Sequence, residues 1–435
     1  MKKPLWHAFS LLYRYPAFGR LWVGRSVSLF GDAFTFIALP WFVLQVTGSG
    51  TATAAILLTL QLPAILTSML IGSLIDRFQP RAILTIDNSL RSPIIGLIPI
   101  LYGLGLLELW LLFLLTFLAG LLQPATEVGL RSILPDLVED EDLDAANMLW
   151  SLSLNLSLVI GPALAGVFVA SFGGPSVLLI DAGTFVVMAF VAITLPILQR
   201  SKPPVQVPLS ERLGLHQLWH MKVVRLTTLL SLVFFFSYGP LEAAMPIYSD
   251  AILQTDARGY GLLWSALAVG ALIGTLSSAT LSRRLRLGVA LPLIALLWGA
   301  SLLPMAFINN LWLACGLLLL GGLMWGPYTP METTLLQRNV PKEQLGRVFG
   351  ARATLLTGGS PLGLALGGLL LAFVPSTGVI ALSAIACILV GLVALLSPTF
   401  RGLSLPSRDV DDGIVDDDLV RLESPLSPDV HDGPR

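Results

Sequence analysis

The distribution of lysine and arginine is the feature of this chain that most restricts its fold. If the apolar runs are read as twelve spanning helices, all but one of the 26 Lys and Arg residues fall in segments that would face one side of a membrane, the exception being Arg258. Because Lys and Arg near helix ends stay on the cytoplasmic side, this pattern predicts that both termini are cytoplasmic. A large soluble helical protein would instead spread its charges over every surface.

The composition also indicates a membrane protein. With 55% hydrophobic residues, 12% charged residues and a mean hydropathy of +0.80, the chain has too little polar surface to coat a soluble fold. A spanning helix takes about 20 apolar residues, and the segment from Phe18 to Ser397 has room for twelve with short connections. The first run, from about Phe18 to Val46, is too long for a signal peptide. We therefore predict an all-α integral membrane protein with twelve transmembrane helices.

Shifts in composition divide the chain. The segment after residue 197 is rich in proline and then becomes amphipathic, so it is read either as a linker with a helix at the headgroup level or as a solvated connector. The aspartate-rich, proline-punctuated end cannot bury a core and is predicted to be disordered. The predicted segments are a cytoplasmic N-terminus (1–17), a six-helix bundle (18–197), a cytoplasmic linker (198–222), a second six-helix bundle (223–397) and an acidic cytoplasmic tail (398–435).

An internal duplication supports this division. Ala38–Trp41, in the first predicted span, matches Ala244–Ile247 in the seventh. The same offset places Gly72–Arg77 over Ser278–Arg283, at the cytoplasmic ends of the second and eighth spans. Parallel six-helix repeats are typical of transporters whose binding site lies between the two halves, near the middle of the membrane.

Residues 72–81 read Gly-Ser-Leu-Ile-Asp-Arg-Phe-Gln-Pro-Arg, which resembles the signature of the major facilitator superfamily in the loop between its second and third helices. Gly31-Asp32, Gly346-Arg347-Val348 and Pro361-Leu362-Gly363 resemble the branch of that superfamily that contains macrolide efflux proteins and the enterobactin exporter. The resemblance extends over the whole spanning region and identifies the superfamily, but not a substrate. Gln79-Pro80, where glycine is common, departs from the pattern and alters the loop.

The loop signature also has a physical reading as a gate. Gly72 lets a neighbouring helix approach closely, by resemblance the eleventh. Asp76 is placed to cap that helix and to pair with Arg347 or Arg131, contacts that form only when the cytoplasmic side is closed. The arginines of the motif also fit ordinary positive-inside anchors. The predicted gating residues are Gly72, Asp76, Arg77, Arg81, Arg131 and Arg347.

Acids inside the spans are costly and normally face a cavity or a partner. Asp32 lies near the middle of the first span and Glu242 in the seventh, and the repeat alignment makes them an opposed pair. Glu127 and Glu332 lie at the cytoplasmic ends of the fourth and tenth spans. In the resembled family these four helices line the cavity, so we assign the four acids to proton coupling or substrate binding. The alternative for each is a structural hydrogen bond or solvation at the headgroups.

Two further intramembrane positions are interpreted as structural. Asp87 and Arg91 stand four residues apart, a spacing that permits an ion pair within one helix. Asp181 is expected near the outer surface.

Carboxyl groups are the proton carriers that the sequence offers. All four histidines fall in predicted cytoplasmic segments, which excludes a histidine relay. No Gly-Lys dipeptide occurs, so there is no phosphate-binding loop for ATP. Clusters with metal-ligand spacing and nucleophile–base sets are also absent from the sequence. We therefore predict neither an enzyme nor a bound metal or cofactor, and no role in nucleic-acid binding.

Aromatic residues in the first, seventh and tenth spans predict a cavity for an apolar or amphipathic molecule. These are Phe36, Trp41, Phe235, Tyr238, Trp325 and Tyr328. The resulting hypothesis is a secondary active exporter of a drug or siderophore-like metabolite, driven by protons through alternating access. It would act as a monomer in the inner membrane. A lipid or lysophospholipid flippase, and a non-transporting sensor or assembly factor that uses the acidic tail, remain as alternatives.

Overall fold

The computed structural model describes residues 5–77, 79–196 and 221–402, and within these ranges every regular element is a helix. Apolar runs form helices because a backbone that crosses a membrane must satisfy its own N–H and C=O groups. Ten helices, some with a short helical extension, are long and apolar enough to cross a bilayer. The chain is a multi-pass membrane protein.

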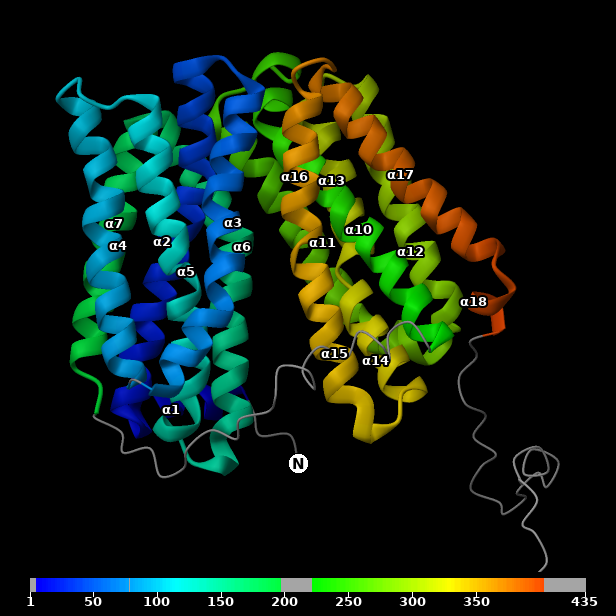
Figure 1. Ribbon diagram of the computed structural model, residues 1–435, viewed down its shortest axis with the longest axis horizontal. Helices are drawn as coiled ribbons and strands as arrows, with labels where there is room; N and C mark the ends of the chain where they lie inside the picture. The colour runs from blue at the N-terminus through cyan, green and yellow to red at the C-terminus, as the bar shows by residue number, and fades with distance from the viewer. Residues whose placement is uncertain (1–4, 78, 197–220, 403–435) are drawn as a thin grey trace, which may run out of the picture.

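The first group of helices lies on the left in Figure 1. In it α2 packs against α6 and α7, α4 against α5 and α7, and α3 against α5. The bounds are α1 (Leu5–Arg14), α2 (Pro16–Thr47), α3 (Gly50–Arg77), α4 (Pro80–Gly103), α5 (Leu109–Leu137), η1 (Asp140–Asp142), α6 (Leu143–Phe172) and α7 (Gly174–Ile193).

The second group lies on the right in Figure 1. Here α10 packs against α16 and α17, α11 against α13, and α12 against α17. The bounds are α10 (Lys222–Ile247), η2 (Tyr248–Ile252), α11 (Ala257–Arg284), α12 (Leu287–Leu302), η3 (Leu303–Phe307), α13 (Leu311–Trp325), α14 (Tyr328–Asn339), α15 (Lys342–Thr357), α16 (Gly359–Leu370), α17 (Ser376–Leu396) and α18 (Pro398–Gly402).

The ten spans are two fewer than the predicted twelve, and the two helices that are not counted are α3 and α4. α3 is 28 residues long, but its apolar part is the shorter stretch Gly50–Ile65. α4 has 24 residues and carries Arg81, Asp87 and Arg91, three charges that interrupt its apolar sequence. Both are long enough to span at 1.5 Å per residue. The count of twelve and the division into two repeats stay predictions.

α1, α18 and the described residues on either side of the segment 197–220 lie toward one end of the helices, which we call the terminal end (Figure 1). α1 belongs to this end and is held there by Arg14, which pairs with Asp142 at 2.9 Å and with Glu139 at 3.1 Å. α18 lies in the first residues of the predicted tail and buries Phe400. The rest of the predicted tail and nearly all of the predicted linker fall outside the described residues.

The two groups meet most closely at the other end, which we call the opposite end. α6 packs on α11, and α3 packs on α16 and α10. A Cβ atom on Gly166 of α6 would stand 2.4 Å from the carbonyl oxygen of Ala257, and one on Gly368 of α16 would stand 2.7 Å from the Cβ of Ala54. Small residues therefore let the helices touch without intervening side chains.

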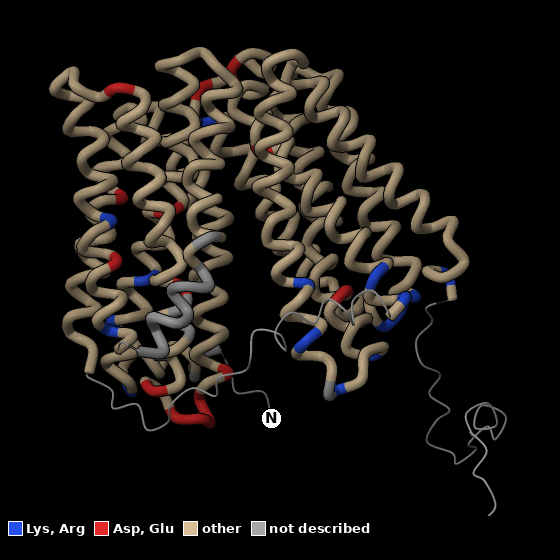
Figure 2. The backbone as a smooth tube through the Cα atoms, in the orientation of Figure 1, with Lys and Arg blue, Asp and Glu red and all other residues tan. Residues whose placement is uncertain are grey.

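Basic residues gather toward the terminal end, as Figure 2 shows in blue. On the second group they lie in the last turn of α11 and in α14 and α15, whereas Arg258 is in the first turn of α11 at the opposite end. This distribution supports a cytoplasmic terminal end, since Lys and Arg favour that side. The orientation itself stays a prediction.

Single cysteines test this orientation. Ser49→Cys, between α2 and α3, should react with a membrane-impermeant maleimide added to intact cells, and Gln79→Cys, between α3 and α4, should react only after the cells are opened. Cys315 is half-buried and should be replaced by alanine in the background, whereas Cys387 is buried. The reverse labelling pattern would place the termini outside.

Candidate functional site

A cavity of about 570 Å³ lies between the two groups of helices. The first group contributes all of the charged side chains together with apolar ones, and the second contributes mainly aromatic and small ones. It reaches from Phe36, in the middle of α2, toward Arg25 and Glu127, nearer the terminal end. The cavity thus lies on the terminal side of the closely packed opposite end.

Four charged side chains form one cluster on the first group's side of the cavity. Arg25 Nη1 lies 3.3 Å from Asp32 Oδ2, and Arg91 Nη2 lies 3.3 Å from Asp32 Oδ1. Arg25 Nη2 also donates to Glu127. The cluster ties α2, α4 and α5 together and balances two positive with two negative charges. Paired in this way, ionised groups can remain at membrane depth.

The acids of this cluster are more accessible than its bases. The side chains of Asp32 and Glu127 are 30% and 47% exposed, whereas those of Arg25 and Arg91 are each 6% exposed. The Arg91 guanidinium also lies 4.1 Å from the centre of the Phe185 ring, a cation–π contact that holds it behind the acids. The cavity surface is therefore more acidic than the balanced charge of the cluster suggests.

Asp181 of α7 is a further acid of the cavity wall. Its side chain is buried and accepts hydrogen bonds from Thr35, at 2.5 Å, and from Thr184, at 3.1 Å. The expectation that it lies near the outer surface is wrong, because it follows two turns of α7 and packs against α2. A Cβ on Gly31 of α2 would stand 2.3 Å from Asp181 Oδ1, so glycine provides the space for this carboxylate.

An aromatic wall faces the charged cluster. Tyr238 lies 5.1 Å from Trp325 and 5.9 Å from Trp264 between ring centres, and Phe36 lies 5.2 Å from Trp264. All four rings line the cavity. They offer flat apolar surfaces on which an aromatic or amphipathic molecule can stack.

Three of the six predicted cavity aromatics do not line this cavity. Trp41 is buried against Tyr260 between the groups, 5.8 Å between ring centres. Tyr328 is buried on Phe234 at 4.2 Å, and Phe235 packs on Trp325 from behind at 5.5 Å. The helix is interrupted between α13 and α14 at Gly326 and Pro327, and Trp325 and Tyr328 both stack on Phe234.

Glu242 is buried behind the cavity rather than exposed in it. Its Oε1 accepts a hydrogen bond of 2.7 Å from Gln61 Nε2, a contact that joins α3 to α10. Gln61 lines the cavity and separates it from the acid. Asp32 and Glu242 do not pair with each other, because Asp32 is occupied by the two arginines. The predicted opposed pair is therefore not formed in this conformation.

Glu332 belongs to a separate buried cluster in the second group. Arg352 Nη2 donates to Glu332 Oε1 at 2.5 Å, and Arg352 Nε donates to Thr228 at 3.0 Å. Ser231 also donates to Glu332. The cluster joins α10, α14 and α15, and none of its members lines the cavity.

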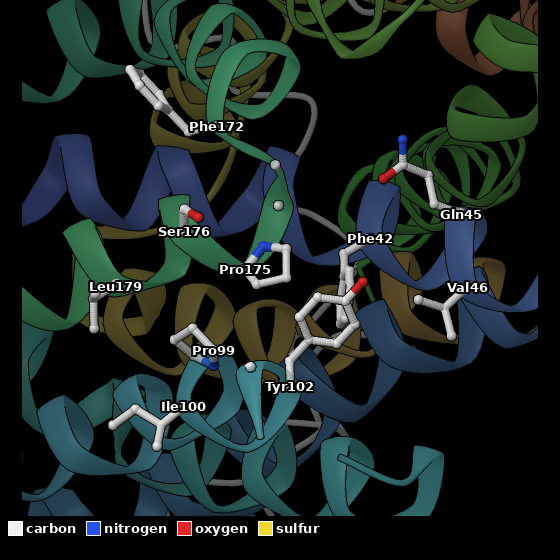
Figure 3. Close-up of a pocket in the computed structure, with 13 residues that line it drawn as sticks. Phe42, Gln45, Val46, Pro99, Ile100, Tyr102, Phe172, Pro175, Ser176 and Leu179 are labelled. Atoms are coloured by element: carbon white, nitrogen blue, oxygen red, sulfur yellow. The ribbon is translucent and has the colours of Figure 1, made fainter. Parts of the chain in front are cut away.

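A second hollow, of about 490 Å³, opens at the opposite end of the first group (Figure 3). Figure 3 shows Pro175 beside Tyr102 and Phe42, whose rings meet edge to face at 5.1 Å. Its lining contains no charged residue and comes from the first group alone. It therefore lacks the two-sided character of a transport site.

The sequence matches the transmembrane secretion effector family over residues 8–420. The chain belongs to this family, a branch of the major facilitator superfamily. The resemblance inferred from the sequence motifs is thereby confirmed.

Three curated relatives match this chain over nearly their full length. The multidrug efflux pump Tap of Mycolicibacterium fortuitum is 27% identical over 390 residues, which covers 87% of this chain and 95% of the relative. Tap of Mycobacterium tuberculosis is 28% identical, covering 88% and 93%. The enterobactin exporter EntS of Salmonella typhi is 26% identical, covering 89% and 93%.

Solved structures show the same fold. A bacterial homologue of the iron transporter ferroportin, in an inward-facing state, has a TM-score of 0.72 at 19% identity and covers 89% of this chain and 99% of its own. The nucleoside transporter NupG has a TM-score of 0.70 at 12% identity and covers 89% and 99%. At such identities the likeness concerns the fold alone.

Most of the predicted gating residues lie where the structure does not describe side chains. The surroundings of Gly72 and the side chains of Asp76, Arg77 and Arg131 lie outside the described part of the structure. Arg81, at the start of α4, is half-buried, and Arg347 of α15 is exposed at the terminal end. The gating role therefore stays a prediction.

The sequence reasoning missed the basic partners of the acids. Arg91 pairs with Asp32 rather than with Asp87, which instead accepts from Thr126, so the predicted ion pair within α4 is wrong. Arg25 stands seven residues before Asp32 in α2, a two-turn spacing that could have placed both on one face. Arg352 gave no such signal, because its acid is on another helix.

No group of three or more His, Cys, Asp or Glu side chains gathers closely enough to hold a metal ion within the described ranges. The contacts that the site shows are ion pairs, hydrogen bonds and aromatic stacking.

The buried pair in the second group predicts a stability effect. Arg352→Ala leaves Glu332 buried without its cation, and breaking such a pair should cost about 3–5 kcal/mol. We expect a lower unfolding temperature of the purified protein in detergent, measured by intrinsic fluorescence. The double variant Arg352→Met with Glu332→Gln should recover part of the loss, since no uncompensated charge remains. A double variant no more stable than Arg352→Ala would contradict this account.

Proposed function

We propose that this protein is a secondary active exporter of amphipathic small molecules, with the cavity between the two groups as its transport site. The observation that carries the proposal is the two-sided wall: accessible carboxylates of Asp32 and Glu127 face the rings of Tyr238, Trp264 and Trp325. A molecule with an apolar ring and a polar or charged group is complementary to both sides. The efflux pump Tap and the enterobactin exporter EntS are relatives that support export as the direction.

The mechanism that we propose is alternating access. Close packing at the opposite end and a cavity on the terminal side correspond to a state that is open toward the terminal end. We place this end on the cytoplasmic side of the inner membrane. Release on the other side requires α3 to separate from α10 and α16, and α6 from α11. The Gln61–Glu242 hydrogen bond is one of the contacts that must then break. The unit of transport is taken to be one chain with its substrate and protons.

The energy source that we propose is the proton gradient. Asp32 faces the cavity, and Glu242 lies behind Gln61 in the contact between the two groups of helices. Protonation of either acid would therefore change the charge at a surface that moves when the groups rearrange. Glu127 is then part of the substrate surface. Glu332, held by Arg352 away from the cavity, supports the second group and is not assigned to coupling.

Removing the charge of the two acids tests this proposal. Asp32→Asn, and to a lesser extent Glu242→Gln, should abolish accumulation of the fluorescent cation ethidium by everted membrane vesicles under a pH gradient. Exchange of ethidium without a gradient should persist in part, because an amide keeps the shape of the acid but carries no proton. Glu139→Gln, on the exposed terminal end, is the matched control and should behave as wild type.

Three results would count against the proposal. Full accumulation in the Asp32→Asn, Glu242→Gln double variant would remove both acids from coupling. Accumulation that ignores the pH gradient in the wild type would remove the proton as the driving ion. Movement of a fluorescent lysophospholipid between leaflets, with no ethidium transport, would favour the flippase alternative.

The loop of residues 72–81 is proposed to latch the terminal end when it closes. The exposure of Arg347 supports this, since a latch partner should be free of the latch in a state open at that end. Asp76→Asn should leave expression unchanged, lower ethidium export strongly and increase thiol labelling at the terminal end. Arg401→Gln, on the exposed α18, serves as control. Normal export by Asp76→Asn would reduce the motif to an orientation signal.

A further inference from the structure

Asp181 and Asp32 are neighbouring acids whose charges are balanced in different ways. Asp32 pairs with both Arg25 and Arg91. Asp181 receives two hydroxyl donors, Thr35 and Thr184, and makes no ion pair within the described structure. Both acids line the same cavity, but Asp181 is buried. A carboxylate buried at membrane depth without a cation is costly, and a bound proton removes that cost.

The helices packed against α7 are α2, α4 and α6, and the charged groups that face Asp181 come from the first two. They are Asp32 on α2 and Arg91 on α4. Arg91 is turned toward Asp32 and stacks on Phe185, which is on the same helix as Asp181. Arg91 therefore stands between two acids and is paired with one of them.

We propose that Asp181 is a further site that binds and releases a driving proton, in addition to Asp32 and Glu242, and that Asp32 positions this site by holding Arg91. The proposal rests on the proton-driven export proposed above and names a group for it. A proton from water adds to a carboxylate oxygen of Asp181 when the opposite side is open. It leaves to water of the cavity when the terminal side is open, and no other bond is made or broken.

The surroundings of Asp181 suit both of its forms. The Thr35 hydroxyl can donate to an ionised carboxylate or accept from a protonated one, so their contact persists in either state. Gly31 provides the space, since a Cβ there would stand 2.3 Å from both Asp181 Oδ1 and Thr184 Oγ1. When the proton leaves, the new charge competes with Asp32 for Arg91. Loss of the proton is thus converted into a rearrangement of the cavity wall.

Infrared difference spectroscopy of the purified full-length protein in lipid membranes tests the proton site without any substrate. Titration between acidic and alkaline pH should reveal the carbonyl band of a protonated carboxylic acid. Asp181→Asn should remove one component of this band, because other buried acids such as Glu242 can contribute the rest. Thr35→Val, which keeps the size of the side chain, should shift its frequency, because the acid loses a hydrogen-bond partner. The matched control is Asp87→Asn, another buried acid that bonds a threonine but does not line the cavity, and it should keep the titrating band.

Proteoliposomes then relate the site to transport. Asp181→Asn should equilibrate ethidium but not accumulate it under a pH gradient, whereas Asp87→Asn should accumulate it as wild type does. A titrating band that Asp181→Asn leaves undiminished, or in which Thr35→Val shifts no component, would overturn the assignment, as would full accumulation by Asp181→Asn. If the wild type moves no ethidium while the band still belongs to Asp181, the proposed export fails and the proton site stands.

Discussion

Charge inside the membrane is the constraint on which the rest of this structure depends. Each ionised side chain at that depth is costly unless a partner neutralises it. Arg25, Asp32, Arg91 and Glu127 meet this condition together, and in doing so they fix α2, α4 and α5 relative to one another. Asp181 meets it through hydroxyl groups instead. This contrast sets apart an acid that is held as an ion from one that can change its charge.

The second group of helices is organised differently, and the difference suits a cavity that lies between unlike walls. Its buried pair, Arg352 and Glu332, lies away from the cavity and stabilises the helices internally. Its cavity surface is left to Tyr238, Trp264 and Trp325. Where α6 meets α11 and α3 meets α16, the groups touch through small residues such as Gly166 and Gly368, which allow close backbone contact. Such contacts can separate as rigid surfaces, which alternating access requires.

The sequence predicted the class of fold because hydropathy and the Lys and Arg distribution are properties of the chain itself. It also found Asp32 and Glu127, since an acid in an apolar run is conspicuous. It failed where the answer depends on how helices are rotated and paired. Trp41 and Tyr328 are buried because their helix faces point to other helices, and Arg91 reaches across to Asp32 rather than along α4. Asp181 was misjudged because its depth depends on where α7 begins.

The central claim is that the cavity between the groups changes sides, and distances between spin labels measure this directly. One pair, at Asp136 and Arg338, spans the groups at the terminal end, and another, at Leu106 and Phe373, spans them at the opposite end; all four side chains are exposed. Double electron–electron resonance on the reconstituted protein at acidic and alkaline pH should show one distance shortening as the other lengthens. Two distances that stay fixed, or that change in the same direction, would contradict the account.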